Sequence, residues 1–290
     1  MPAMKVLTEP EYLYVIAAVA GSATWVLLNR RPLAGDTAIA LYILLVGSLY
    51  TALRYSAPFH ARAFSTAVGL SITYTLSAGL ATSGYRLSPW HPLADVPGPR
   101  LWHITSLWLS WVSWKGRRYL ILDRLHAKYG PYLRIGPDTI SINSLSAQYI
   151  YSASAHMPKS ESYRAPGHKK QVALFFKQPN EKLHSDRKRV WQGLFTKDGI
   201  SQLFPVLEKR TYDLIQCMER RQSLDATGCI DLTECFYHWA YDLMGDMVFG
   251  GASKLEMMQH GDPSNLVTGG KIATAIVDSI GQTPWLMDLV

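Results

Sequence analysis

The sequence predicts a mainly α-helical protein in which transmembrane helices precede a helical domain with a small β-hairpin. Three observations indicate this fold class. Long uncharged apolar runs occupy the first part of the chain, a proline-rich stretch follows them, and segments with helical periodicity fill most of the remainder. We expect a membrane anchor over residues 1–88, a proline-rich hinge over 89–100 and a partial helical domain over 101–290.

Three apolar runs predict the anchor. They contain no charged residue and are each followed by arginine within a few positions; they are Leu13–Leu28, Thr37–Leu53 and Ala63–Tyr85. A helix that crosses a bilayer needs about 20 mostly apolar residues, so we interpret the runs as three spans. The small residues of the third run favour close helix packing in lipid. A secretory signal peptide explains the first run less well, because no basic region precedes it and two further runs follow.

The charged residues between the runs bear on orientation. Arg30 and Arg31 favour a cytosolic first loop, which places the region after the third span in the cytosol. Arg54 and Arg62 in the second loop argue for the opposite orientation. The chain has three cysteines, with no CxxC pair and no zinc-ligand spacing, which agrees with a reducing compartment.

The region after the anchor combines prolines with tryptophans. Prolines 89, 92, 97 and 99 exclude a helix and favour an extended, stiff linker. Trp102, Trp108, Trp111 and Trp114 follow within a short stretch. Indole rings prefer the interface between membrane and water, but a tryptophan-rich core helix would show the same spacing, so both interpretations remain open.

The remainder of the chain predicts a hairpin and several helices. Tyr132–Ile135 and Thr139–Ile142 read as two strands joined by a Gly-Pro-Asp turn. A long loop is expected over residues 153–179. Helices are expected at residues 119–129, from Asn143 or Ser144 to Tyr151, and at 180–195, 200–221, 232–249 and 270–280, with Asn180 and Asp231 as N-caps of the helices they precede and Gly250 as a stop signal.

The segment LHSDRKRVWQGLF, Leu183–Phe195, contains consecutive basic residues. On a helix, His184, Lys188, Trp191 and Phe195 share one narrow stripe, beside an apolar face of Leu183, Val190 and Leu194. The basic residues therefore do not form the single cationic face that nucleic-acid binding requires. The stripe suits a flat, apolar partner with an anionic edge, but its spacing alone favours a core helix whose Lys188 amine reaches water.

Four stretches, taken in order, resemble the cytochromes P-450, the haem-thiolate monooxygenases, and most closely the membrane-bound enzymes of filamentous fungi. PGPR at Pro97–Arg100 is similar to the family's proline-rich hinge, and KYGPYLRIGPDTISINSLSAQYIY at Lys128–Tyr151 to its first hairpin and following helix. HSDRKRVWQGLF at His184–Phe195 resembles the helix that crosses the haem edge, and DLMGDMVFGG at Asp242–Gly251 the end of a core helix. A three-span anchor departs from the single span usual in the family.

The resemblance implies a helical domain around haem b, an oxidoreductase activity on a small organic substrate with O2, and an NADPH-dependent reductase as partner. It implies a role in fungal secondary metabolism and a place in the endoplasmic-reticulum membrane, with the globular part facing the cytosol. His184 and Lys188 occupy the two positions that contact the haem propionates in the family. Arginine is usual at the second position, and lysine can meet a carboxylate only as a point charge.

The family's axial cysteine loop and its oxygen-activating helix have no counterpart in these residues, so no catalytic residue or metal ligand is predicted. We expect that the chain is truncated and does not bind haem stably by itself. The alternative is a catalytically inactive, membrane-anchored remnant with a binding or regulatory role. A three-span membrane protein of another class fits the ordered motifs less well.

Overall fold

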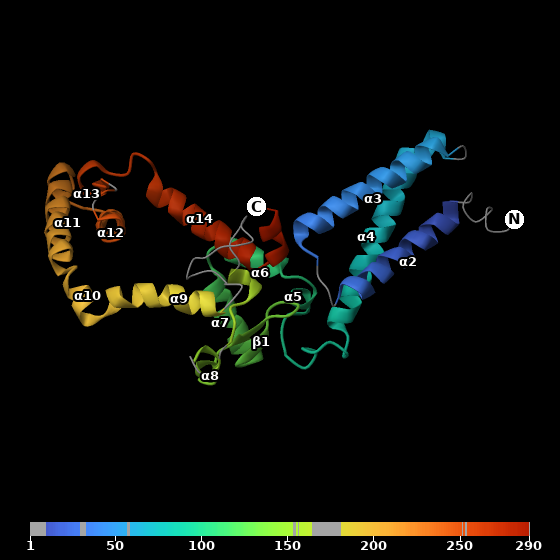
Figure 1. Cartoon of the computed structure of the whole chain (residues 1–290), viewed down its shortest axis with the longest axis horizontal. Helices are drawn as coiled ribbons and strands as arrows, with labels where there is room; N and C mark the ends of the chain where they lie inside the picture. The colour runs from blue at the N-terminus through green and yellow to red at the C-terminus, as the bar shows by residue number, and fades with distance from the viewer. Residues whose placement is uncertain are drawn as a thin grey trace. The chain divides into compact units, whose positions relative to one another are not determined.

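The computed structural model describes residues 10–29, 33–56, 59–152, 155, 157–163, 181–250, 252 and 254–289. These residues are mainly helical with one two-stranded antiparallel sheet, which confirms the predicted fold class (Figure 1). Contacts group the chain into two compact units, Met1–Lys169 with Val277–Val290 and Lys170–Ile276. The division into anchor, hinge and domain remains a prediction, because contact grouping does not locate a membrane boundary.

The first unit begins with three long apolar helices, α2 (Pro10–Leu28), α3 (Gly35–Tyr55) and α4 (Ala63–Leu87). A short 3-10 turn, η1 (His60–Arg62), leads into α4. All three helices are long and apolar enough to cross a membrane. Most of their large apolar side chains are exposed, as expected for surfaces that face lipid rather than water.

Helix α2 packs along α4, and small residues allow the close approach (Figure 1). The Ser77 hydroxyl on α4 donates a hydrogen bond to the Ala18 carbonyl on α2 at 2.8 Å, and the Tyr74 hydroxyl donates to Thr24 Oγ1 at 2.9 Å. A Cβ atom at Gly21 would lie only 2.3 Å from the Tyr74 carbonyl oxygen. Glycine at this position is therefore required for the contact.

Replacing Gly21 with valine is expected to separate α2 from α4, since the added side chain would collide with backbone atoms of α4. Cysteines introduced at Thr24 and Tyr74, joined by a short bismaleimide in membranes, should cross-link several-fold less efficiently. Gly79→Val is the matched control, because a Cβ at Gly79 meets no atom within 4 Å. An equal loss of cross-linking in both variants would contradict the assigned interface.

The rest of the first unit is a small helical group with a hairpin. Its elements are α5 (Arg100–Ile104), α6 (Leu107–Trp114), α7 (Arg118–Tyr129), β1 (Tyr132–Arg134), β2 (Ile140–Ile142), α8 (Ala147–Tyr151), η3 (Glu161–Tyr163), the end of α14 (Leu266–Gly281) and η5 (Pro284–Asp288). The hairpin pairs Leu133 with Ser141, which confirms the predicted strands and turn. The core of this helical group contains Trp102, Leu109, Val112, Leu133 and Ile135.

The proline-rich stretch is not the extended linker that the sequence predicts. Residues 88–96 form successive turns, in which the amide of His91 donates to the Ser88 carbonyl at 3.2 Å and that of Ala94 donates to the His91 carbonyl at 2.9 Å. Residues 97–99 have no regular secondary structure, and Pro99 among them is extended. Proline excludes a helix but is compatible with turns, and here turn hydrogen bonds satisfy the backbone.

The second unit consists of α9 (Glu181–Gln192), η4 (Gly193–Phe195), α10 (Lys197–Ser201), α11 (Phe204–Leu224), α12 (Leu232–Phe249), α13 (Met257–His260) and most of α14. The single helix predicted over residues 200–221 is wrong: α10 ends at Ser201, and α11 starts anew with Pro205 in its first turn. Helix α12 has the predicted bounds and the predicted caps, Asp231 and Gly250. The predicted Asn180 cap and most of the 153–179 loop lie outside the described residues.

Candidate functional site

Helix α9 places the two predicted haem contacts one turn apart. His184 and Lys188 are separated by four residues, so their side chains lie on the same face of the helix. His184 is half-buried and Lys188 is exposed. Within the described part of the chain, neither side chain has a hydrogen-bond or ion-pair partner, which leaves their donors available to an anion.

The neighbours of these two residues differ in character around the helix. Trp191, one turn beyond Lys188, is 48% exposed and presents an open aromatic ring. Arg189 lies off this stripe and pairs with Asp186 at 3.8 Å. The stripe thus combines an imidazole, an uncommitted amine and an exposed indole, and this donor set fits a planar apolar group that carries carboxylates at its edge.

The apolar residues of α9 and η4 distinguish between the two interpretations of this segment. Val190 on α9 is 78% exposed and Leu194 in η4 is 53% exposed, which a core helix would not show. None of the three buried apolar clusters formed by the described residues includes a residue of α9. Helical periodicity gives an apolar face but cannot say which surface covers it.

The cysteines occupy structural positions. Cys217 on α11 and Cys235 on α12 are buried in one cluster with Leu214 and Met258, while Cys229 is exposed in the connecting loop. Burial raises the pKa of the Cys235 thiol, with a smaller opposing effect from Arg221. A protonated, enclosed thiol acts as a small apolar group rather than as a metal ligand. The described residues contain no cluster of three or more His, Cys, Asp or Glu side chains that could hold a metal ion.

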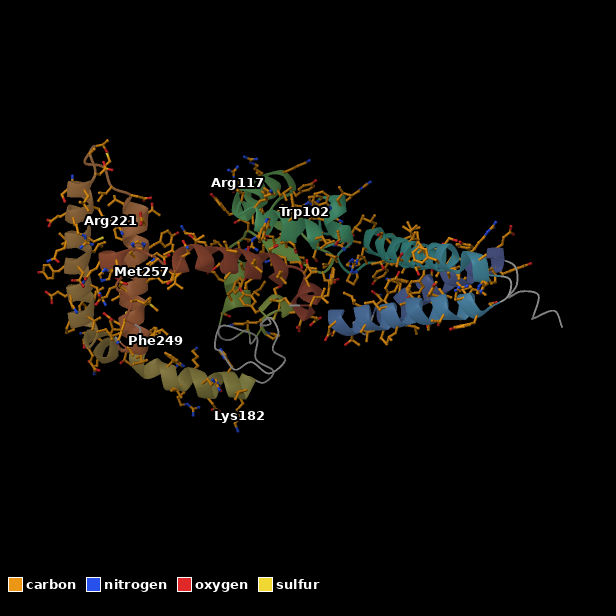
Figure 2. The ribbon with its side chains drawn as sticks, turned by 90° about the horizontal axis from the view of Figure 1, so that it is seen from above. Trp102, Arg117, Lys182, Arg221, Phe249 and Met257 are labelled. Carbon is orange, nitrogen blue, oxygen red and sulfur yellow. The ribbon has the colours of Figure 1, made fainter. Side chains whose placement is uncertain are left out.

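Residues of the motif DLMGDMVFGG make contacts that hold the helices of the second unit together. Helices α11 and α12 lie side by side (Figure 2). Arg210 near the start of α11 donates to Asp246 near the end of α12 at 2.7 Å, whereas Arg221 near the end of α11 meets His238 at 2.6 Å. The two helices are therefore antiparallel. The hydrogen bond from Arg210 is the main cause that lowers the pKa of Asp246.

Asp242 holds α13 against α12. Its side chain is fully buried, and its two carboxylate oxygens accept hydrogen bonds from the amides of Met257 at 2.8 Å and Met258 at 2.9 Å. These amides begin α13 and have no partner within that helix. Gly250 then ends α12 in the left-handed conformation, with φ of 58°. Sequence reasoning predicted the role of Gly250 but not that of Asp242.

The other two motifs, PGPR and YLRIGP, contact each other. The amide of Arg134 donates to the Pro97 carbonyl at 2.8 Å, so the end of the proline-rich stretch lies beside β1. A Cβ at Gly98 would lie 2.3 Å from the Arg134 carbonyl oxygen. The glycine between the prolines therefore permits the close approach of the two backbones.

Arg134 forms hydrogen bonds to several segments around the hairpin and the proline-rich stretch. Its guanidinium is buried and donates to the backbone carbonyls of Pro137 at 2.8 Å, Arg86 at 3.2 Å and Leu93 at 3.4 Å. Burial lowers the pKa of Arg134, and burial together with the Arg134 charge lowers the pKa of His91. Sequence analysis did not single out Arg134, although a charged residue flanked by Leu133 and Ile135 in a strand is a signal that could have found it.

These features define a helical domain with a small hairpin and a proline-rich entry, attached to apolar helices that could anchor it in a membrane. Comparison with known proteins gives the particular family. The chain matches the family model of cytochrome P-450 over residues 96–285, and it belongs to that family.

Several fungal monooxygenases are similar to the chain. Cytochrome P-450 monooxygenase gsfF of Penicillium aethiopicum is 32% identical over 62% of this chain and 38% of its own length. Cytochrome P-450 monooxygenase cpaH of Aspergillus oryzae is 26% identical over 79% of this chain and 44% of its own length. Tryprostatin B 6-hydroxylase of Neosartorya fischeri is 30% identical over 62% of this chain and 32% of its own length.

The matched part covers less than half of each of these relatives. No solved structure matches the chain. The roles assigned above to Asp242 and Arg134 therefore come from the chain's own geometry.

Proposed function

We propose that this chain provides the N-terminal part of a membrane-bound cytochrome P-450 monooxygenase of fungal secondary metabolism, which oxidises a small organic substrate with O2. The family match over residues 96–285 is the observation that carries this proposal. The names of its relatives support the biosynthetic context: one is a tryprostatin B 6-hydroxylase and others are fungal monooxygenases.

His184 and Lys188 are proposed to hold the propionates of haem b. Support comes from their shared face on α9, the lack of partners for both side chains among the described residues, and the exposed ring of Trp191 beside them. Lys188 would neutralise one carboxylate as a point charge, and His184 would donate a hydrogen bond from its ring. Haem, when bound, supplies the iron at which dioxygen is activated.

The apolar helices α2, α3 and α4 are proposed to anchor the protein in the endoplasmic-reticulum membrane, with the helical domain in the cytosol. Arg30 and Arg31 between the first two spans support this orientation. An NADPH-dependent reductase is the proposed electron donor, on family grounds alone. Nucleic-acid binding is not proposed. Arg189 pairs with Asp186 and lies off the stripe of Lys188, so the two basic residues do not form one cationic face.

Lys188→Glu is expected to weaken haem binding about tenfold, equivalent to about 1.4 kcal/mol, because a carboxylate would replace the cation that faces a propionate. The measurement is the haem content of the protein made from the complete native transcript, titrated with haem after purification. Lys188→Arg should retain or strengthen binding, since a guanidinium can hold a carboxylate through two hydrogen bonds.

Arg189→Glu is the control for this charge reversal, because it lies on the same helix but pairs with Asp186. Equal losses of haem in Lys188→Glu and Arg189→Glu would contradict the assigned contact and indicate a general effect of charge. His184→Phe should lower haem affinity less than Lys188→Glu does, since it removes one hydrogen bond but no charge.

The experiment that tests the proposed function itself is sequencing of the native transcript across the codon for Val290, followed by haem analysis of the product. A reading frame that continues into a cysteine-bearing haem loop, with a haem-containing product, supports the monooxygenase. A frame that stops there, with no haem in the product, favours the haem-free, membrane-anchored remnant instead.

A further inference from the structure

A groove of about 670 Å³ lies between α3 and α4, two of the candidate membrane spans. Small-molecule sites usually have volumes of about 300–1,000 Å³, so the groove is large enough for a ligand. Along α3 its lining extends for eight residues, or about 12 Å at the rise of an α-helix. Aromatic and small side chains from both helices form it, among them Tyr42, Gly47, Tyr50, Phe64, Ser71 and Thr75.

The walls of the groove suit an apolar occupant. The hydroxyls of Ser71 and Thr75 donate to backbone carbonyls of α4 itself, at 2.8 Å and 2.9 Å, and are therefore already paired. The rings of Tyr50 and Phe64 meet edge to face, with centres 6.5 Å apart. A Cβ atom at Gly47 would meet no atom within 4 Å, so α4 leaves the space beside this glycine open.

The end of the groove towards the α3–α4 connection is positively charged. Gly47, Tyr50 and Arg54 follow one another at intervals of three and four residues, so Arg54 continues the face of α3 that lines the groove. The Arg54 guanidinium lies 2.8 Å from Nδ1 of His60. His60 belongs to the short turn η1, close to where α3 and α4 meet (Figure 1).

No acidic side chain nearby in the sequence balances this charge, since residues 37–94 contain neither Asp nor Glu. Arg54 and Arg62 are both exposed, and neither forms an ion pair within the part of the chain that the structure describes. In the orientation proposed above, this connection faces the lumen. The preference of basic residues for cytosolic loops therefore gives no reason for arginines here, whereas an anionic ligand would.

We propose that α3 and α4 bind one phospholipid of net negative charge, with an acyl chain in the groove and the phosphate at Arg54. A guanidinium can hold a phosphate through two parallel hydrogen bonds. The cationic end distinguishes a phospholipid from a wholly apolar occupant, such as a sterol or another helix. The site rests on the membrane anchoring proposed for these helices and adds a specific ligand to it.

The test is native mass spectrometry of the full chain, released from nanodiscs with equal amounts of dioleoyl phosphatidylserine and dioleoyl phosphatidylcholine. The unchanged protein should retain mainly phosphatidylserine. Arg54→Gln should lower the ratio of retained phosphatidylserine to phosphatidylcholine about fivefold, which corresponds to about 1 kcal/mol for one cation at a lipid surface. Arg62→Gln is the matched control. It removes the same charge from the same connection, but Arg62 lies two residues before Phe64 and so does not share its face.

Gly47→Leu tests the groove independently of charge. Its side chain would fill the space for the acyl chain without colliding with α4, so retention of both phospholipids should fall several-fold. Gly79→Leu is the control, because a Cβ at Gly79 also meets no atom within 4 Å and Gly79 does not line the groove.

Equal retention of the two phospholipids by the unchanged protein would overturn the proposal, and so would equal losses in Arg54→Gln and Arg62→Gln. A dimer that Gly47→Leu dissociates without loss of lipid would show that a second copy of the chain fills the groove instead. Failure of the anchor is read separately, as release of the chain from membranes by alkaline carbonate. That result would overturn the lipid site together with the anchor, whereas loss of lipid selection alone leaves the anchor intact.

Discussion

Replacing Arg134 with methionine is expected to lower the free energy of unfolding of the first unit by about 3–5 kcal/mol. The guanidinium is 1% exposed and donates to backbone carbonyls from three parts of the chain, represented by Arg86, Leu93 and Pro137. Methionine has a similar length but no donor. Those carbonyls would then be buried without hydrogen-bond donors, and each unpaired carbonyl would lower the free energy of unfolding.

The measurement is hydrogen exchange, read by mass spectrometry, over residues 88–99 and the hairpin in the purified full chain. Exchange in both segments should accelerate in Arg134→Met, since Arg134 joins them. Arg134→Lys should show a smaller effect because an amine donates fewer hydrogen bonds than a guanidinium. Arg124→Met on α7, at an exposed position, is the control. Unchanged exchange over residues 88–99 in Arg134→Met would show that the turns do not depend on this side chain.

Asp242→Ala is the second large effect, with an expected loss of about 3–4 kcal/mol in the second unit. The carboxylate is 0% exposed and accepts the first two amides of α13, Met257 and Met258. Alanine would leave both amides buried without an acceptor, and water could not reach them without opening the unit. The expected result is accelerated exchange of α13 and of the α12 segment that faces it.

Asp262 offers a close comparison on the same unit. Its carboxylate accepts the amides of Leu266 and Val267, each at 2.8 Å, at the start of α14. This cap is much more accessible to solvent, so Asp262→Ala should cost only about 1 kcal/mol, as is usual for an N-cap. Similar exchange in the two alanine variants would mean that burial does not enhance the Asp242 contact. Asp242→Asn should fall between Asp242→Ala and the unchanged protein, since its amide keeps one acceptor.

Local sequence signals predicted most elements well. The bounds of α12 follow from Asp231, whose side chain accepts the amides of Thr233 and Glu234, and from Gly250, which adopts the left-handed conformation. The hairpin follows from a Gly-Pro-Asp turn between two short apolar segments. These features depend on interactions between residues that are near in sequence, so periodicity and capping patterns are sufficient to locate them.

The prolines show where such signals are insufficient. Four prolines correctly excluded a helix over residues 89–99, but they did not distinguish an extended linker from a chain of turns. That choice involves Arg134, which lies about 40 residues away and donates to the Leu93 carbonyl of this stretch and to the Arg86 carbonyl at the end of α4. A contact at this separation leaves no periodic trace in the local sequence.

The candidate haem contact was predicted from the sequence to the extent that a single helix defines it. His184 and Lys188 share a face because they are four residues apart, and α9 is a helix as expected. Val190 and Leu194 are both exposed among the described residues, so this part of the chain does not form the core helix that the spacing also allows. Periodicity reports the direction of a side chain about a helix axis, but its burial depends on what the rest of the protein places there.

The sequence by itself determined the helical class, the three apolar helices, the hairpin and the family of this protein, because composition, periodicity and short motifs act over a few residues. Only the tertiary structure decided that Arg134 closes the proline-rich turns, that Asp242 caps a separate helix, and that α6 turns its tryptophans outward while burying two serines. Each of these depends on hydrogen bonds between segments that are distant along the chain. Their partners become neighbours only when the chain is folded.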